Sequence, residues 1–285
     1  MEDGQPSRTA LATAAARTAH LIVDHDPRIF EDTLAIVLLG DLADDLVGAH
    51  RSGMDAENLA RMRVAMTTRS RYTEDHLAEA VRRGIAQYVL LGAGLDSFAY
   101  RSSLVGQLRV FEVDHPATQA WKRERLAAAT IAVPSGVTFV AVDFRVDSLR
   151  DRLIGMGFDR SQPAFVSWLG VTQYLTREAI GTTLDVIGGL AQGTELVMEY
   201  LLPGEMRDAP GEALAKFFIP RAAASGESWL TFFSPTGIGE LLTARGLVVA
   251  EDVGRRDQID PRLWERSDAL RPHELGRLVR AVVAK

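Results

Sequence analysis

The sequence of 285 residues contains no cysteine. The chain therefore forms no disulfide, binds no zinc or iron–sulfur cluster through thiolates, and uses no cysteine nucleophile. It also lacks an excess of positive charge, because 32 Lys and Arg stand against 38 Asp and Glu, for a net charge of −6. Without a basic surface to bind phosphates, nucleic acid is not an expected partner.

Long hydrophobic runs are missing as well. The strongest apolar run near the start, residues 34–39, ends at Gly40 and is far shorter than the roughly 20 residues that cross a bilayer. The first charged residues are acidic, which argues against a secretory signal. The histidines show no metal-ligand spacing. We expect a cytoplasmic protein without a membrane segment and without a bound metal.

Short apolar runs alternate with helical stretches in the second and third quarters of the chain. The runs are residues 88–91, 108–113, 137–142, 164–169 and 196–198, and the helical stretches include 117–129 and 177–190. This alternation is typical of βαβ units and predicts an α/β fold with a Rossmann-like, doubly wound, mostly parallel sheet. The tail at 278–284 is expected to add an antiparallel strand.

The chain is expected to form a single domain, 1–285, because no linker divides it. It begins with a helical part, 1–84, in which Thr73 is expected to cap a helix. A cofactor-binding core, 85–200, follows, and 201–233 would be a cap-like insertion. The C-terminal helix and strands occupy 234–285. The aromatic side chains of the insertion could be ordinary core or the wall of a substrate pocket.

The ends of the predicted strands carry residues that suit a nucleoside ligand. In a doubly wound sheet, ligands bind beyond the carboxyl ends of the strands. Gly92 and Gly94 follow the first strand, where glycines let the backbone approach a ligand. Asp114 ends the second strand about twenty residues on, the spacing of an acid that binds ribose hydroxyls. Asp143 follows the third strand and suits the amino group of an adenine.

Ser97 argues against a pyrophosphate ligand. A dinucleotide-binding turn requires a third glycine at this position, so that the helix and the phosphates can approach closely. Adenosine without pyrophosphate, as in S-adenosylmethionine, therefore fits better than NAD. An NAD-dependent oxidoreductase remains an alternative, and so does a relative that binds the cofactor without transferring a methyl group.

Several blocks together resemble the leucine carboxyl methyltransferase family, in particular its bacterial branch of class I S-adenosylmethionine-dependent methyltransferases. The resemblance runs from about residue 10 to the end of the chain. It implies a class I methyltransferase fold with S-adenosyl-L-methionine as cofactor. The blocks that carry it, in chain order, are Arg69 to Tyr72, Leu90 to Ser97, Phe111 to Pro116, Val142 to Phe144 and Gly170 to Leu175.

The resemblance also implies roles for individual cofactor-binding residues. Arg71 matches the family arginine that binds the methionine carboxylate, although Arg69 lies close enough to take its place. Gly92 and Gly94 match the loop that passes the methionyl part. Asp114 matches the acid on the ribose hydroxyls.

The same resemblance assigns Asp143 and Phe144 to the adenine. The carboxylate of Asp143 would accept a hydrogen bond from the amino group, and the backbone amide of Phe144 would donate one to a ring nitrogen. One position departs from the family. Relatives often carry Glu before the Gly-Val that follows the fourth strand, and Leu169 stands here. The role of that acid near the cofactor is therefore lost or has moved elsewhere.

Methyl transfer requires no protein nucleophile, because the sulfonium already activates the methyl carbon, so the sequence assigns no catalytic residue. It also offers no convincing general base. A carboxylate is ionised at neutral pH and needs none. We therefore expect O-methylation of a carboxylate or an acidic hydroxyl on a small molecule, with Gln173 and Tyr174 positioning that substrate. The oligomeric state is not predicted.

Overall fold

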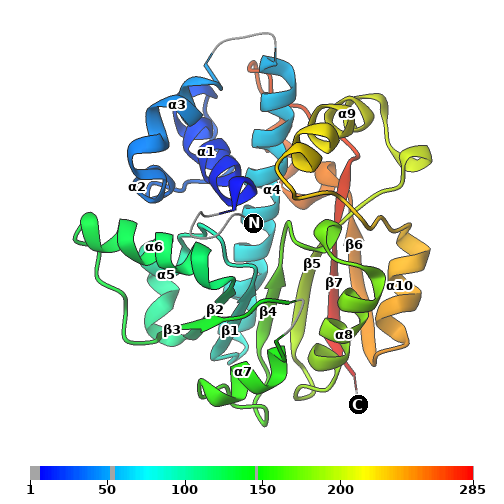
Figure 1. Ribbon diagram of the computed structural model, residues 1–285. Helices are drawn as coiled ribbons and strands as arrows, with labels where there is room; N and C mark the ends of the chain where they lie inside the picture. The colour runs from blue at the N-terminus through cyan, green and yellow to red at the C-terminus, as the bar shows by residue number, and fades with distance from the viewer. Residues whose placement is uncertain (1–6, 52–54, 145–146, 285) are drawn as a thin grey trace.

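The computed structural model describes residues 7–51, 55–144 and 147–284. Seven strands of these residues form one sheet in the order β3-β2-β1-β4-β5-β7-β6 (Figure 1). The strands are β1 (Gln87–Leu91), β2 (Arg109–Asp114), β3 (Val137–Ala141), β4 (Phe165–Trp168), β5 (Glu195–Leu201), β6 (Leu247–Val253) and β7 (Gly276–Val283). Strands β1 to β5 pair in parallel, whereas β7 is antiparallel to both β5 and β6. The predicted doubly wound sheet and its antiparallel last strand are confirmed.

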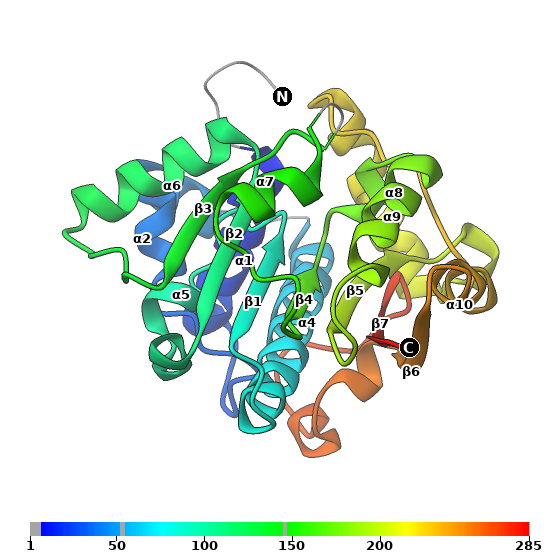
Figure 2. The same ribbon diagram turned by 90° about the horizontal axis from the view of Figure 1, so that it is seen from below.

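Helices cover both faces of the sheet (Figure 2). One face packs against α4, α5 and α6, and the other packs against α7, α8 and α10. Side chains of a strand alternate between these faces, which is why β1 and β4 are buried along their whole length. The helices are α1 (Arg8–Val23), α2 (Ala35–Leu39), α3 (Ala43–Gly48), α4 (Ala56–Arg82), α5 (Phe98–Arg101), α6 (Pro116–Ala128), α7 (Leu149–Gly155), α8 (Arg177–Gly188), α9 (Ala209–Ala224) and α10 (Pro235–Thr243).

The helical N-terminal part is present, but one of its predicted boundaries is wrong. Thr73 does not cap a helix, because it lies inside α4, a helix of 27 residues. Its hydroxyl donates a hydrogen bond to the carbonyl oxygen of Arg69 over 2.8 Å. A threonine is tolerated inside a helix when its hydroxyl bonds back in this way. The following acid, Glu74, pairs with Arg101 instead of forming a first helical turn.

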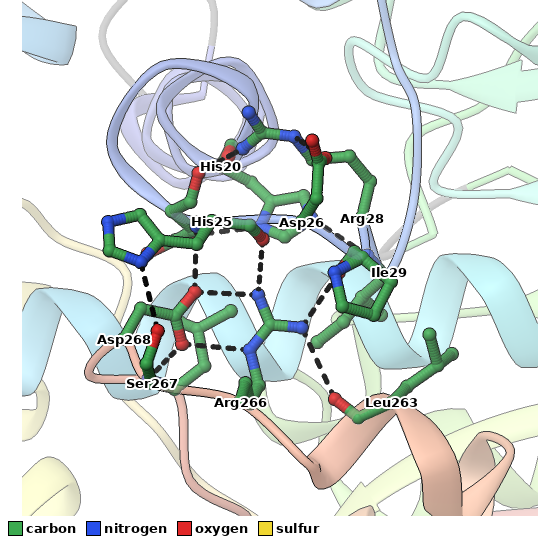
Figure 3. Close-up of polar contacts among 12 residues, drawn as sticks. His20, His25, Asp26, Arg28, Ile29, Leu263, Arg266, Ser267 and Asp268 are labelled. Atoms are coloured by element: carbon green, nitrogen blue, oxygen red, sulfur yellow. Dashed lines mark hydrogen bonds and ion pairs between the residues drawn. The ribbon is translucent and has the colours of Figure 1, made fainter.

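A cluster of polar side chains fastens the N-terminal helices to the C-terminal region (Figure 3). The guanidinium of Arg266 donates to the carbonyl oxygens of Pro27 and His25 at 2.9 and 2.8 Å. The same group pairs with Asp268, whose carboxylate also accepts the backbone amide of His25. Burial alone would raise the pKa of Asp268, but the bonds from Arg266 and the backbone amides hold that pKa well below its usual range.

We expect Arg266→Ala to lower the free energy of unfolding by about 2–4 kcal/mol, because it removes one side of a buried ion pair. Arg262→Ala is the matched control. Arg262 also pairs with an aspartate two residues away, Asp260, but its side chain is 83% exposed, whereas that of Arg266 is 0% exposed. The control should change stability by about 0.5 kcal/mol or less. Urea unfolding measures both, and equal effects would contradict the structural role of Arg266.

Candidate functional site

A cavity of about 520 Å³ lies beyond the carboxyl ends of β1, β2, β3 and β4. Its floor is the loop after β1, and α1 and the segment after α9 form its upper walls. In Figure 1, α1 and α9 lie at this end of the sheet. The cavity is therefore at the position where ligands bind in doubly wound sheets. Its volume suits a ligand of the size of a nucleoside with an amino-acid tail.

The glycine loop takes a conformation that only glycine adopts without strain. Gly92 and Gly94 have φ of +71° and +50°. The amides of Gly92 and Ala93 donate to the carbonyl oxygen of Val113 at 2.8 and 3.0 Å, which holds the loop against β2. A Cβ on Gly92 would lie 2.2 Å from Cγ2 of Val171. At Gly92 and Gly94 the loop therefore presents only backbone to the cavity.

Asp114 is fixed with its carboxylate at the cavity. One oxygen accepts the amide of Gly94 over 2.5 Å and the other accepts the amide of His115 over 2.6 Å. Burial raises the pKa of Asp114, and the two amides work against that rise. The acid predicted to bind the ribose is thus held rigidly beside the glycine loop. Asp143 and Phe144 border the same cavity beyond β3, as expected from the sequence.

The structure corrects the arginine assignment. Arg71 does not border the cavity, because its side chain is 45% exposed and pairs with Asp75 in the next turn of α4. Arg69 borders it instead and lies against Gly170, whose missing Cβ makes room for the guanidinium. Residues two apart on a helix point in different directions, so only one of the two arginines can face the site. The prediction for Arg71 is wrong in its placement.

Arg69 belongs to a buried ionic cluster with Glu199 and Arg255. Nη1 of Arg69 lies 2.6 Å from one oxygen of Glu199, and Nη2 of Arg255 donates to the other. Burial alone would raise the pKa of Glu199, but the two arginines lower it below its ordinary value. Two guanidinium groups share one carboxylate, so the cluster has a net positive charge in a buried setting.

A second cavity, of about 330 Å³, adjoins the first and is called the acceptor cavity below. Thr9, Arg69, Gly170, Tyr174 and Glu227 border both cavities. The rest of the wall is mainly apolar and comes from α4, β5, α9 and the segment before β7; it includes Met62, Met66, Leu201, Leu214 and Leu275.

The aromatic side chains of the insertion divide between the two interpretations that the sequence left open. Phe218 and Trp229 line the acceptor cavity. Phe233 instead belongs to the main core under α8 and α10. The insertion is therefore partly pocket wall and partly ordinary core.

One carboxylate borders both cavities. Glu227, in the segment after α9, accepts hydrogen bonds from the hydroxyls of Ser7 and Thr9 over 2.7 and 2.5 Å. The Tyr174 hydroxyl lies 3.2 Å from the same Thr9 oxygen. Tyr174 thus lies at the junction of the cavities. Gln173 borders the acceptor cavity and donates to the Gly170 carbonyl over 3.2 Å.

Three further polar residues near the glycine loop make contacts within the fold, and two of them, Asp96 and His115, also border the larger cavity. Glu112 points away from the cavity and pairs with Lys122 at 2.7 Å, both side chains being 1% exposed. Asp96 accepts the amide of Phe98 at the start of α5. His115 caps α6 by accepting the amide of Ala117.

The sequence reasoning missed Glu199, Arg255, Thr9 and Glu227. Glu199 had a signal, because it follows the apolar run of β5 at the sheet end where ligands bind. Nothing in the sequence indicates that Thr9 and Glu227 are neighbours, because 218 residues separate them.

Neither a membrane-spanning helix nor a metal-binding cluster is found in the described residues. Among residues 7–51, 55–144 and 147–284, no helix is both long and apolar enough to cross a bilayer. In the same part of the chain, three or more histidine or acidic side chains nowhere gather in a way that could hold a metal ion.

Comparisons with known proteins agree with the fold. The model of the leucine carboxyl methyltransferase family matches residues 10–188. A Bacillus subtilis protein named "Putative S-adenosyl-L-methionine-dependent methyltransferase YktD" is 31% identical over 304 residues, which cover 99% of each chain.

Two solved structures show the same fold at low sequence identity. A DUF574 family protein from Streptomyces avermitilis has a TM-score of 0.61 and 20% identity, covering 93% of this chain and 100% of its own. A magnesium protoporphyrin IX methyltransferase from Synechocystis, solved with bound SAH, has a TM-score of 0.50 and 12% identity, covering 85% and 100%. By the extent of the family match, this chain belongs to the leucine carboxyl methyltransferase family.

Proposed function

We propose that this chain, an S-adenosyl-L-methionine-dependent methyltransferase by its family and its relatives, methylates an oxygen of a carboxylate or an acidic hydroxyl on a small molecule. The observation that supports this type of acceptor is the composition of the acceptor cavity. Its walls are largely apolar. It adjoins the larger cavity of about 520 Å³, called the cofactor cavity below, and a buried cluster with net positive charge borders it.

The residues of the larger cavity fit the cofactor. Asp114, fixed by two amides, would accept the ribose hydroxyls, and Asp143 with Phe144 would hold the adenine. Arg69 would pair with the methionine carboxylate, for which a guanidinium is well suited. When bound, the cofactor supplies a methyl group on a positively charged sulfur that leaves as a neutral thioether.

Ser97 disfavours the dinucleotide alternative. Its side chain is buried, and its hydroxyl donates to Asp32 over 2.5 Å and accepts from Arg101 over 2.9 Å. The position that a pyrophosphate-binding turn fills with glycine is therefore part of an internal polar network. This favours S-adenosylmethionine over NAD.

The apolar acceptor cavity favours an anionic acceptor. A carboxylate and a sulfonium both lose their charge on methyl transfer, so weak solvation destabilises the reactants more than the neutral products. A neutral amine would instead finish with a positive charge close to Arg69 and Arg255, which is unfavourable. The geometry thus supports O-methylation more than N-methylation.

An ionised acceptor also agrees with the groups at the junction of the cavities. Burial raises the pKa of Tyr174, so its phenol stays protonated and is a poor base. Both oxygens of Glu227 accept hydrogen bonds from Ser7 and Thr9. A carboxylate needs no proton removed before it attacks, so neither side chain has to act as a base.

Labelled S-adenosylmethionine and a panel of small carboxylic acids test this proposal. We expect label to enter alkali-labile methyl esters, with kcat/KM constant from about pH 6 to about pH 9 because the acid stays ionised. Asp114→Asn is the negative control and should abolish the label through loss of cofactor binding. Label in an alkali-stable N-methyl product would contradict O-methylation, and a steep rise of kcat/KM with pH would indicate a hydroxyl acceptor.

A further inference from the structure

Four residues that border the acceptor cavity carry a buried polar atom without a hydrogen-bond partner among the described residues: Gln173 (Oε1), Trp229 (Nε1), Arg255 (Nε) and His273 (Nδ1). His273 and Arg255 both border it and are only 1% and 2% exposed. Nδ1 of His273 and Nε of Arg255 are buried and have no hydrogen-bond partner among the described residues. Nearly all buried polar atoms in proteins are paired, so the unpartnered atoms of His273 and Arg255 beside one cavity indicate that a ligand group completes them.

The hydrogen bonds of His273 decide which of its nitrogens can accept. Nε2 lies 3.1 Å from the carbonyl oxygen of Arg61, which can only accept, so Nε2 carries the proton. Burial and the nearby charge of Arg255 lower the pKa of His273 to about 4, so the ring is neutral at pH 7. Nδ1 is then a lone pair that accepts a hydrogen bond.

Whereas His273 offers a hydrogen-bond acceptor, Arg255 offers a donor. Its Nη1 donates to Gln258 over 3.1 Å and to the carbonyl oxygen of Ala65 over 3.4 Å, and its Nη2 donates to Glu199. The N–H on Nε is a donor that has no partner among the described residues. At His273 and Arg255 the wall therefore offers one acceptor and one donor, near enough to each other for the charge of Arg255 to lower the pKa of His273.

A neutral hydroxyl complements this pair better than a charged group does. It donates to Nδ1 of His273 and accepts from Nε of Arg255 at the same time. A carboxylate would be repelled by the lone pair on Nδ1, and an ammonium would be repelled by the charge of Arg255.

We propose that His273 is a specificity-determining residue that accepts a hydrogen bond from a neutral hydroxyl of the methyl acceptor, which makes the acceptor a hydroxylated carboxylic acid. This inference rests on the proposed O-methylation. The carboxylate of such an acid lies at the junction with the cofactor cavity, next to Arg69 and Gly170. Its hydroxyl lies against His273 and Arg255, in the part of the wall that the cofactor cavity does not share.

Matched acid pairs test the proposal: phenylacetic and 4-hydroxyphenylacetic acid, and hexanoic and 6-hydroxyhexanoic acid. We expect the unmodified protein to prefer at least one hydroxylated member by roughly tenfold in kcat/KM, since a site built to bind a hydroxyl rejects the analogue lacking it. His273→Gln keeps a donor for the Arg61 carbonyl but replaces the Nδ1 lone pair by an amide oxygen in a different position, and should lower that ratio. His273→Leu removes both functions and should do the same.

His76→Gln is the control, because His76 borders neither cavity and should leave the ratio as it is. A merely structural role for His273 would change both rates by one factor and leave the ratio intact, which would overturn the proposal. So would a wild-type ratio near one for every pair.

Titration of SAH-loaded protein with the same acids separates this proposal from the proposed function. Tighter binding of a hydroxylated acid that depends on His273, without methyl transfer, would support the inference while the O-methylation fails. Equal binding of both members, or no binding of any acid, would overturn it.

Discussion

Arg69→Met should lower the affinity for S-adenosylmethionine by roughly 10- to 150-fold, the loss expected when a charged hydrogen bond of about 1.5–3 kcal/mol is removed. Arg69 borders the cofactor cavity, and its guanidinium lies against Gly170. Methionine retains most of the aliphatic volume, and Glu199 keeps Arg255 as a partner, so no buried acid is left unpaired. Titration calorimetry with S-adenosylhomocysteine measures the change.

Arg71→Met is the matched control from the same helix. Because Arg71 is exposed and pairs with Asp75 outside the cavity, its loss should change cofactor affinity less than about twofold. Urea unfolding of both variants without ligand separates a binding effect from a folding effect. If Arg71→Met weakens binding and Arg69→Met does not, the assignment from the sequence is right and the placement of Arg69 carries no function.

Gly92→Ala should lower the free energy of unfolding by about 2–5 kcal/mol and weaken cofactor binding at least about tenfold. A φ of +71° costs an alanine about 1–2 kcal/mol, and the added Cβ would meet Val171 at 2.2 Å, an overlap that costs about 1–3 kcal/mol more. Relief of that overlap moves the loop, and with it the amide of Gly94 that orients Asp114.

Gly84→Ala controls for the backbone strain alone. Gly84 also has a positive φ, +99°, but an added Cβ would meet nothing within 4 Å. It should cost only the backbone strain of about 1–2 kcal/mol and leave cofactor affinity unchanged. Urea unfolding and calorimetry measure both variants. Wild-type affinity in Gly92→Ala would show that the loop backbone does not approach the cofactor.

The sheet and the glycine loop could be predicted because their signals are local. A strand buried on both faces is a short apolar run, and the residues just after it lie at the ligand-binding edge. This reasoning found Gly92, Gly94, Asp114 and Asp143, all of which border the cofactor cavity. It also indicated the antiparallel last strand.

The errors arise where a partner distant in sequence decides the outcome. Arg69 and Arg71 look alike in the sequence, and only the packing of α4 against β5 shows that Arg69 faces Glu199. Thr73 looks like a cap until its hydroxyl is seen to bond back to Arg69. His273 lies outside any helix or strand, so no periodic pattern could place it beside the cavity.

The position of β7 has a consequence for how the chain reaches its active form during synthesis. This strand ends at Val283, yet it is not an edge strand, because it inserts between β5 and β6. Its segment leaves the ribosome after those of β5 and β6, so these two strands lack the strand that joins them until β7 has been synthesised. The Arg69–Glu199–Arg255 cluster spans α4, β5 and the turn after β6. Removing β7 would therefore take away the strand that connects the two elements carrying Glu199 and Arg255.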